Sequence, residues 1–99
     1  MKMDRAEIKT WVADNDKCLS SEPLTFDEIA HVAMCLEHIQ QWYYEGYPLG
    51  DFLTAVVRND FRLACVKADE VNRKALYLYA LFMYNYMPAD YDAKAGLMR

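Results

Sequence analysis

The chain has 99 residues, of which 55% are hydrophobic and 14% aromatic, and its formal net charge is −4. This length fits one small domain with its own hydrophobic core. Three Gly and three Pro are too few for the closely spaced turns of an all-β fold. The excess of acidic side chains argues against binding to a phosphate backbone, so direct nucleic-acid binding is not expected.

The first predicted helix starts at Asp4, with Glu7 three residues later as its capping partner, and ends at Asn15. Its apolar side chains share one face: Ile8, Trp11 and Val12. A loop is expected from there to Pro23. Residues 1–23 are therefore expected to form a short helix and a loop.

The second predicted helix has the strongest local signals. Thr25 and Glu28 form a capping box, and Leu24 and Ile29 have the spacing of a hydrophobic staple. Gly46 is the expected C-cap. The apolar stripe comprises Ile29, Val32, Leu36, Ile39 and Tyr43, widened by Phe26 and Ala33.

Asp51 is the predicted cap of a third helix. The pair Asn59-Asp60 is a plausible break, so residues 51–67 are either one bent helix or two short ones. Asp69 or Asp60 caps the last helix, which is expected to run to Met87 and to stop before a proline. Residues 89–99 are expected to form a tail.

The last helix is unusually apolar. Residues 75–87 contain one polar side chain, Asn85, apart from tyrosine hydroxyls. A helix that is apolar all round is either central in the core or shared with another subunit. We therefore expect a single all-α domain over residues 1–99, a bundle of four to five helices with its core in residues 24–88, whose last helix is shared in a homodimer.

The cysteines and the N-terminus indicate a cellular compartment. Three Cys without a CxxC spacing, and a polar N-terminal stretch unlike a signal peptide, favour free thiols in a reducing cytoplasm. The longest apolar run, residues 75–84, is too short to cross a bilayer. A cytoplasmic protein without membrane association is expected.

Four side chains on the second helix are of metal-ligand types at spacings of three, four and three: Glu28, His31, Cys35 and His38. They are either a metal site or an exposed polar face. Because such spacing often occurs by chance, the pattern favours the exposed polar face. No Gly-rich phosphate loop and no marked catalytic triad is present in the sequence. We expect no catalytic residues and no cofactor.

Charged side chains suggest two further surfaces. An acidic face that could meet a basic partner comprises Asp27, Glu28, Glu37 and Glu45, although such charges also simply maintain solubility. A possible anion-binding patch comprises Arg58, Arg62, Arg73 and Lys74. Because Asp60, Asp69 and Glu70 interleave with these bases, surface ion pairing is the alternative that the pattern favours.

Aromatic side chains are concentrated on the last helix. Candidates for an interface are Tyr77, Tyr84, Tyr79, Phe82 and Tyr86. An ordinary aromatic core, with hydroxyls reaching the surface, is an equally good interpretation.

A longer pattern covers a little under half of the chain. It comprises Gly46, Pro48, Gly50, residues 52–57, Asn59-Asp60, Ala64, Ala68-Asp69, Asn72, Leu76, Tyr84-Asn85 and Pro88. With these residues the stretch from Tyr44 to Pro88 resembles a family of small proteins encoded by bacteriophages and prophages. The resemblance implies phage origin and a role inside the host cell during infection, and it implies no reaction.

These observations lead to one functional hypothesis and two alternatives. The chain is expected to be a non-enzymatic phage protein that binds and inhibits a host defence or nucleic-acid-processing protein, as an anti-CRISPR or similar counter-defence protein does. The first alternative is a helical module that sequesters a small anionic ligand such as a nucleotide. The second is a metal-binding helical protein.

Overall fold

The computed structural model describes residues 2–18 and 23–87, and within them it contains helices and no strand. The elements are α1 (Arg5–Asn15), the 3₁₀ turn η1 (Asp16–Cys18), α2 (Phe26–Glu45), α3 (Asp51–Val57), α4 (Phe61–Lys67) and α5 (Glu70–Tyr86). The predicted all-α bundle is confirmed. The predicted tail, residues 89–99, lies outside the described residues.

Both predicted capping boxes are confirmed. The Asp4 side chain accepts the Glu7 N–H, and the Glu7 carboxylate accepts the Asp4 N–H in return. Thr25 and Glu28 are paired in the same way at the start of α2. These reciprocal bonds satisfy N–H groups that a helix start otherwise leaves without partners.

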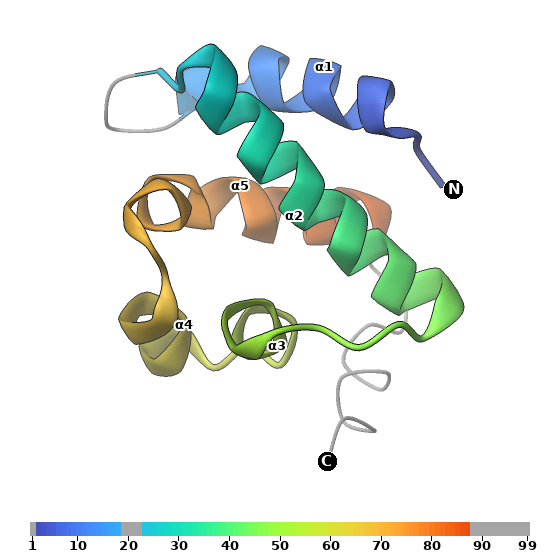
Figure 1. The fold of residues 1–99 in the computed structure, drawn as a ribbon, viewed down its shortest axis with the longest axis vertical. Coiled ribbons are helices and arrows are strands. Elements are labelled where there is room, and N and C mark those ends of the chain that lie inside the picture. The colour runs from blue at the N-terminus through green and yellow to red at the C-terminus, as the bar shows by residue number, and fades with distance from the viewer. Residues whose placement is uncertain (1, 19–22, 88–99) are drawn as a thin grey trace.

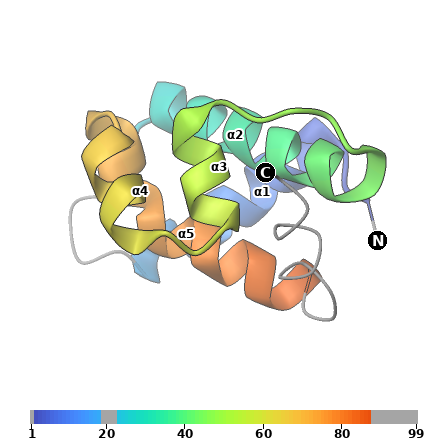
Figure 2. The same ribbon diagram turned by 90° about the horizontal axis from the view of Figure 1, so that it is seen from below.

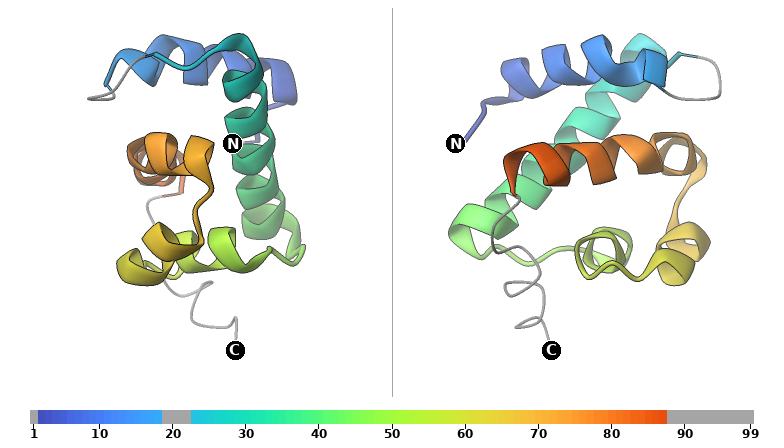
Figure 3. Two further views of the ribbon diagram at one scale, coloured as in Figure 1. Left: turned by 60° about the vertical axis from the view of Figure 1, so that its left-hand side comes forward. Right: turned by 180° about the vertical axis from the view of Figure 1, so that it is seen from behind.

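Helix α5 occupies the middle of the molecule. Figure 1 shows α1 on one side of α5 and the α3–α4 pair on the other, while α2 crosses in front of them as a long diagonal. The two further views show the same three levels, with α2 connecting the level of α1 to that of α3 (Figure 3). Helix α5 therefore lies centrally within one chain, which is one of the two positions that its apolar sequence allows.

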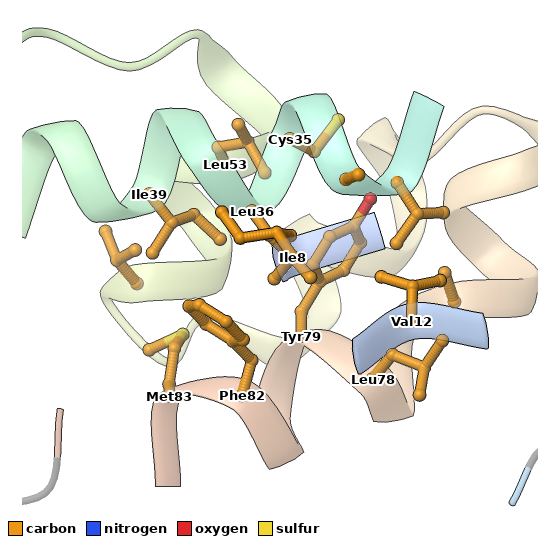
Figure 4. Close-up of a cluster of buried hydrophobic side chains, with 14 of the residues drawn as sticks. Ile8, Val12, Cys35, Leu36, Ile39, Leu53, Leu78, Tyr79, Phe82 and Met83 are labelled. Carbon is orange, nitrogen blue, oxygen red and sulfur yellow. The ribbon is translucent and has the colours of Figure 1, made fainter. Parts of the chain in front are cut away.

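The core lies where α5 meets α1 and α2. Tyr79 and Phe82 of α5 are fully buried there, among aliphatic side chains of α1 and α2 (Figure 4). The Trp11 ring meets the Phe82 ring edge-on, with 5.2 Å between ring centroids. Tyr79 and Phe82 thus belong to the core of the chain, which corrects the prediction that places them at an interface.

The apolar stripe of α2 differs from the prediction at one end. Phe26 is 79% exposed. It is the first residue of α2, and the Lys9 ammonium of α1 lies 5.5 Å from the centre of its ring. Its ring is therefore at the surface and does not extend the buried stripe.

Residues 51–67 form two helices, which settles the alternative that the sequence leaves open. Asn59 has φ 59°, in the left-handed region that ends helices. Asp60 then caps α4, because its side chain accepts the Leu63 N–H at 3.1 Å. The predicted cap of α3 is displaced by one residue: Gly50 is the N-cap and Asp51 is the first helical residue.

Helix α5 begins after Asp69, one of the two caps that the sequence leaves open, and the Asp69 carboxylate accepts the Asn72 N–H at 2.8 Å. It ends at Tyr86, directly before Met87. Among the described residues, no helix is long and apolar enough to cross a membrane.

Candidate functional site

An open groove with a volume of about 740 Å³ lies between α3, α4 and α5. Each of the three helices contributes one alanine to it: Ala55, Ala64 and Ala80. Figure 2 shows the three helices around this part of the molecule, on the side opposite α1. We call this site the α3–α5 groove.

Helix α4 forms one wall of the groove, and little of its surface is buried against the rest of the domain. Ala64 is its only buried residue. Phe61, which lines the groove, is 77% exposed, and Val66 on another side of the helix is 73% exposed. A seven-residue helix that exposes large apolar side chains has apolar surface left for another contact.

The outward side of α5 forms the opposite wall. Tyr77, Ala80 and Tyr84 are spaced at three and four residues, so they share one face of the helix, and all three are exposed and line the groove. Tyr77 and Tyr84 are therefore the two predicted interface aromatics that lie at the groove. Tyr86, the remaining candidate, is half-buried, with its ring 6.2 Å from that of Trp11.

The predicted acidic face is largely used inside the chain. The Glu28 carboxylate receives the Lys74 ammonium of α5 at 2.9 Å. Glu37 pairs with Arg5, and Glu45 pairs with Lys2. Within the described residues only Asp27 of the four predicted acids has no ion pair. The acids of α2 therefore connect it to α5 and to the N-terminal residues 2–5.

The four bases of the predicted anion patch are not gathered into one site. Lys74 is paired with Glu28, and the Arg73 Nε donates to the carbonyl of Ala68 at 3.3 Å. Arg58 and Arg62 are exposed and form no ion pair within the described residues. The expected pairing of these bases with Asp60, Asp69 and Glu70 is also not found there.

The four candidate metal ligands have other environments. Glu28 is held by Thr25 and Lys74. His31 Nε2 lies 3.6 Å from Asp69 Oδ2 and 3.9 Å from Cys35 Sγ, whereas His38 is exposed. In the part of the chain that the structure describes, no group of three or more His, Cys, Asp or Glu is arranged to hold a metal ion.

The contact between His31 and Cys35 does not have the geometry of nucleophilic catalysis. Asp69 and Cys35 both lie near the same ring nitrogen, whereas a triad uses the two nitrogens for different partners. Burial raises the pKa of the Cys35 thiol above its usual range, so this side chain stays protonated. The thiolate is the nucleophilic form, and this site does not favour it.

A buried polar cluster lies next to this contact. The Tyr79 hydroxyl points towards α2 (Figure 4) and donates to Asn72 Oδ1, from which Cys35 Sγ lies 3.9 Å away. Burial raises the pKa of the Tyr79 hydroxyl far above its usual range, because the charged phenolate would lose its hydration. The cluster joins α5 to α2 and leaves none of these buried side chains without a partner in the described residues.

Sequence reasoning missed the groove itself. Alanine carries no chemical signature, and Ala55, Ala64 and Ala80 come together only because the turn at Asn59-Asp60 sets the direction of α4. The one available signal is Phe61, an apolar residue directly after a helix cap.

Comparisons of the chain with protein-family models, with curated proteins and with solved structures gave no significant match.

Proposed function

We propose that this chain is a non-enzymatic protein of phage origin that binds a host defence or nucleic-acid-processing protein through the α3–α5 groove and thereby inhibits it. The observation that carries the proposal is the open apolar groove, bordered by Phe61, Tyr77 and Tyr84, which are 77%, 54% and 76% exposed. Exposed apolar surface of this kind on a small domain is typical of a protein-binding site.

The aromatic side chains around the groove can supply the affinity. Burying a large apolar side chain contributes roughly 1.5–3 kcal/mol. Burial of three such rings would offset part of the free-energy cost of association. Tyrosines are common among the residues that dominate binding energy, because the ring is rigid and the hydroxyl tolerates water at the rim.

The acidic face is a weaker candidate for the binding surface. Three of its four carboxylates already have basic partners within the chain. A partner would have to replace these ion pairs, whereas the groove is open. Three features support a host defence or nucleic-acid-processing protein as the target. They are the resemblance to phage proteins, the small size of the chain and the lack of a catalytic motif in its sequence.

The experiment compares two Ala→Arg substitutions at exposed helical positions. Ala80→Arg places a long charged side chain in the groove, and Ala13→Arg makes the same change on α1. Tagged wild-type chain and both variants are expressed in a bacterial host that carries a defence nuclease. Co-purifying proteins are identified by mass spectrometry, and interference with incoming phage DNA is measured as plaquing efficiency.

We expect one protein to co-purify stoichiometrically with the wild type and with Ala13→Arg. Both chains should also abolish the interference of the host nuclease with incoming phage DNA. Ala80→Arg should lose both effects while its circular dichroism spectrum stays unchanged. Equal capture and inhibition by Ala80→Arg would contradict the proposal. The apolar last helix predicts from the sequence a homodimer that shares this helix. Because the exposed face of α5 lines the groove, such a dimer would appear as a sedimentation coefficient that falls in Ala80→Arg alone.

A further inference from the structure

We infer that a second copy of this chain occupies the α3–α5 groove, in a twofold dimer whose two α5 helices run antiparallel and cross at Ala80. A target protein then has to displace one copy before it reaches the groove. The dimer follows from the geometry of α5, whereas the competition with a target rests on the proposed function and adds a form of regulation to the same site.

The outward face of α5 is not covered by the rest of the domain. In the view from behind, no other helix that the structure describes crosses in front of α5 (Figure 3). Tyr77, Ala80 and Tyr84 are exposed on this face. Residues 75–86 carry no charged side chain, over about three helical turns, although the whole chain has a net charge of −4. Two copies therefore meet at this face without bringing like charges together.

The residue sizes along this face are complementary to themselves when the helix is reversed. Tyr77 and Tyr84 lie seven residues apart on one line along α5, with the small Ala80 between them. A twofold dimer needs such a self-complementary surface. With Ala80 opposite the partner's Ala80 and the helices antiparallel, Tyr84 of each copy lies next to Leu76 and Tyr77 of the other. The alanine methyl groups let the helix axes approach closely, and the rings pack on both sides of the crossing.

A base at one end of this face favours the antiparallel orientation. Arg73 is exposed and forms no ion pair within the described residues, and only its Nε is engaged, with the Ala68 carbonyl. Arg73 and Met87, the C-cap of α5, are each seven residues from Ala80, so they lie opposite each other in the antiparallel pair. The last turn of α5 has no basic side chain of its own, and a helix C-terminus attracts a cation. Each Arg73 therefore supplies this charge to the other copy.

Two acids lie near this face, and neither opposes the contact. Glu70 lies about one turn further from Ala80 than Arg73 does, and so beyond the last residue of the partner's α5. Asp60 is the one charged side chain that lines the groove, and it is engaged as the cap of α4, where it accepts the Leu63 N–H at 3.1 Å. The adjoining hollow is lined by two acids and two bases, so it adds no net charge.

The exposed aromatic area is suited to a weak dimer. Phe61, Tyr77 and Tyr84 border the groove and are each more than half exposed. Because an aromatic side chain buries roughly 150–250 Å², complete burial of these three rings would cover roughly 300–500 Å² on each copy. The smaller specific interfaces bury about 600 Å² per partner, so the rings supply half of that area or more. An interface of this size dissociates on dilution, as displacement by a target requires.

Sedimentation velocity of the full chain over a wide range of concentrations tests the dimer. The wild type and Ala13→Arg, an exposed change on α1, should pass from monomer to dimer as the concentration rises. Ala80→Arg, which places two charged side chains at the crossing, should stay monomeric with an unchanged circular dichroism spectrum. Arg73→Gln should weaken the dimer roughly three- to thirtyfold, because it removes two symmetric contacts with a helix end. Lys17→Gln, at an exposed base of η1, should leave the dimer as it is.

A disulfide cross-link tests the crossing in a variant that adds no charge. Ala80→Cys is made in a chain whose Cys18 and Cys65 are replaced by serine. Mild oxidation should link two Ala80→Cys chains into a covalent dimer on a non-reducing gel, whereas Ala13→Cys in the same background should stay monomeric.

The orientation is tested by mixing Tyr77→Cys and Tyr84→Cys chains in that background. Antiparallel helices should give the mixed cross-link in preference to a link between two identical chains. Preferential linking of each variant to itself would indicate parallel helices and would overturn the proposed arrangement.

A wild type that is monomeric at every concentration, or a dimer that persists in folded Ala80→Arg, would overturn the inference, while capture of a host protein would still support the proposed function. A groove dimer that captures no host protein would leave the dimer standing and contradict the proposed function. A host complex that retains both copies and still forms the cross-link through Ala80→Cys would overturn the displacement.

Discussion

The Lys74 ammonium of α5 lies 2.9 Å from Glu28 Oε1, on the carboxylate that also closes the capping box of α2. One side chain therefore both starts a helix and joins two helices. The Thr25 backbone N–H, and next the Lys74 side chain, hold the pKa of the Glu28 carboxyl below its ordinary value of 4.5. A lowered pKa in the folded state means that stability is gained above the unfolded pKa and lost as the pH falls through the folded pKa.

The first prediction follows from this pair. The urea midpoint of the wild type should fall as the pH is lowered below about 4.5, since folding then opposes protonation of Glu28. In Lys74→Met the fall should be smaller, because one of the two main causes of the lowered pKa is removed. Lys17→Met, which changes an exposed base without an ion pair in the described residues, should behave as the wild type. Identical slopes for Lys74→Met and the wild type would show that Glu28 and Lys74 are not coupled.

The buried cluster gives the second prediction. Tyr79→Phe removes the hydroxyl that donates to Asn72 Oδ1 and leaves that oxygen with the weak thiol donor of Cys35. We expect a loss of about 1–3 kcal/mol in the free energy of unfolding, measured by urea denaturation. Tyr77→Phe, the same change at an exposed position, should cost less than about 0.5 kcal/mol. Similar values for the two variants would contradict the hydrogen bond.

The turn between α3 and α4 gives the third prediction. Asn59 has φ 59°, which Asn and Gly tolerate and a β-branched residue does not. Asn59→Gly should leave stability nearly unchanged, whereas Asn59→Val should destabilise the domain by roughly 1–2 kcal/mol. Thermal melts of the two variants measure the difference. Asn59→Val should also weaken binding at the groove, because the turn sets the direction of α4.

The fourth prediction separates binding residues from core residues. Phe61→Ser and Val66→Ser replace side chains that are 77% and 73% exposed, so the free energy of unfolding should change by less than about 0.5 kcal/mol. Phe82→Ala, in the fully buried core, should cost about 3–5 kcal/mol. If Phe61→Ser destabilised the domain as strongly as Phe82→Ala, the ring would be part of the core and not a free wall of the groove.

Local signals in the sequence account for most of the fold. The capping pairs at Asp4 and Thr25, the glycine stop at Gly46 and the break at Asn59-Asp60 are each decided by bonds within a few residues, and each is found where the pattern predicts it. Phe26 is the exception in α2. Its spacing fits the apolar stripe, but it is the first residue of the helix, and its ring meets the Lys9 ammonium at the surface.

The candidate site was far less predictable, for a physical reason. Whether a tyrosine of α5 belongs to the core or to the surface depends on which helices pack against each side of α5. The pattern of residues within α5 does not show which side is covered. Tyr79 and Tyr77 are two residues apart, yet one is fully buried and the other is 54% exposed. Likewise, the charges of Glu37 and Glu45 suggest an acidic surface until the fold brings Arg5 and Lys2 to them.

Chemical-shift mapping of alanine methyl groups determines whether the chain binds another protein at the α3–α5 groove. The full chain, labelled at alanine methyls, is titrated with the protein that co-purifies with it. If the groove is the binding site, the methyl signals of Ala55, Ala64 and Ala80 should shift with one common dissociation constant, while those of Ala6 and Ala13 on α1 should not move. Shifts confined to α1, or no saturable shift at Ala80, would contradict it.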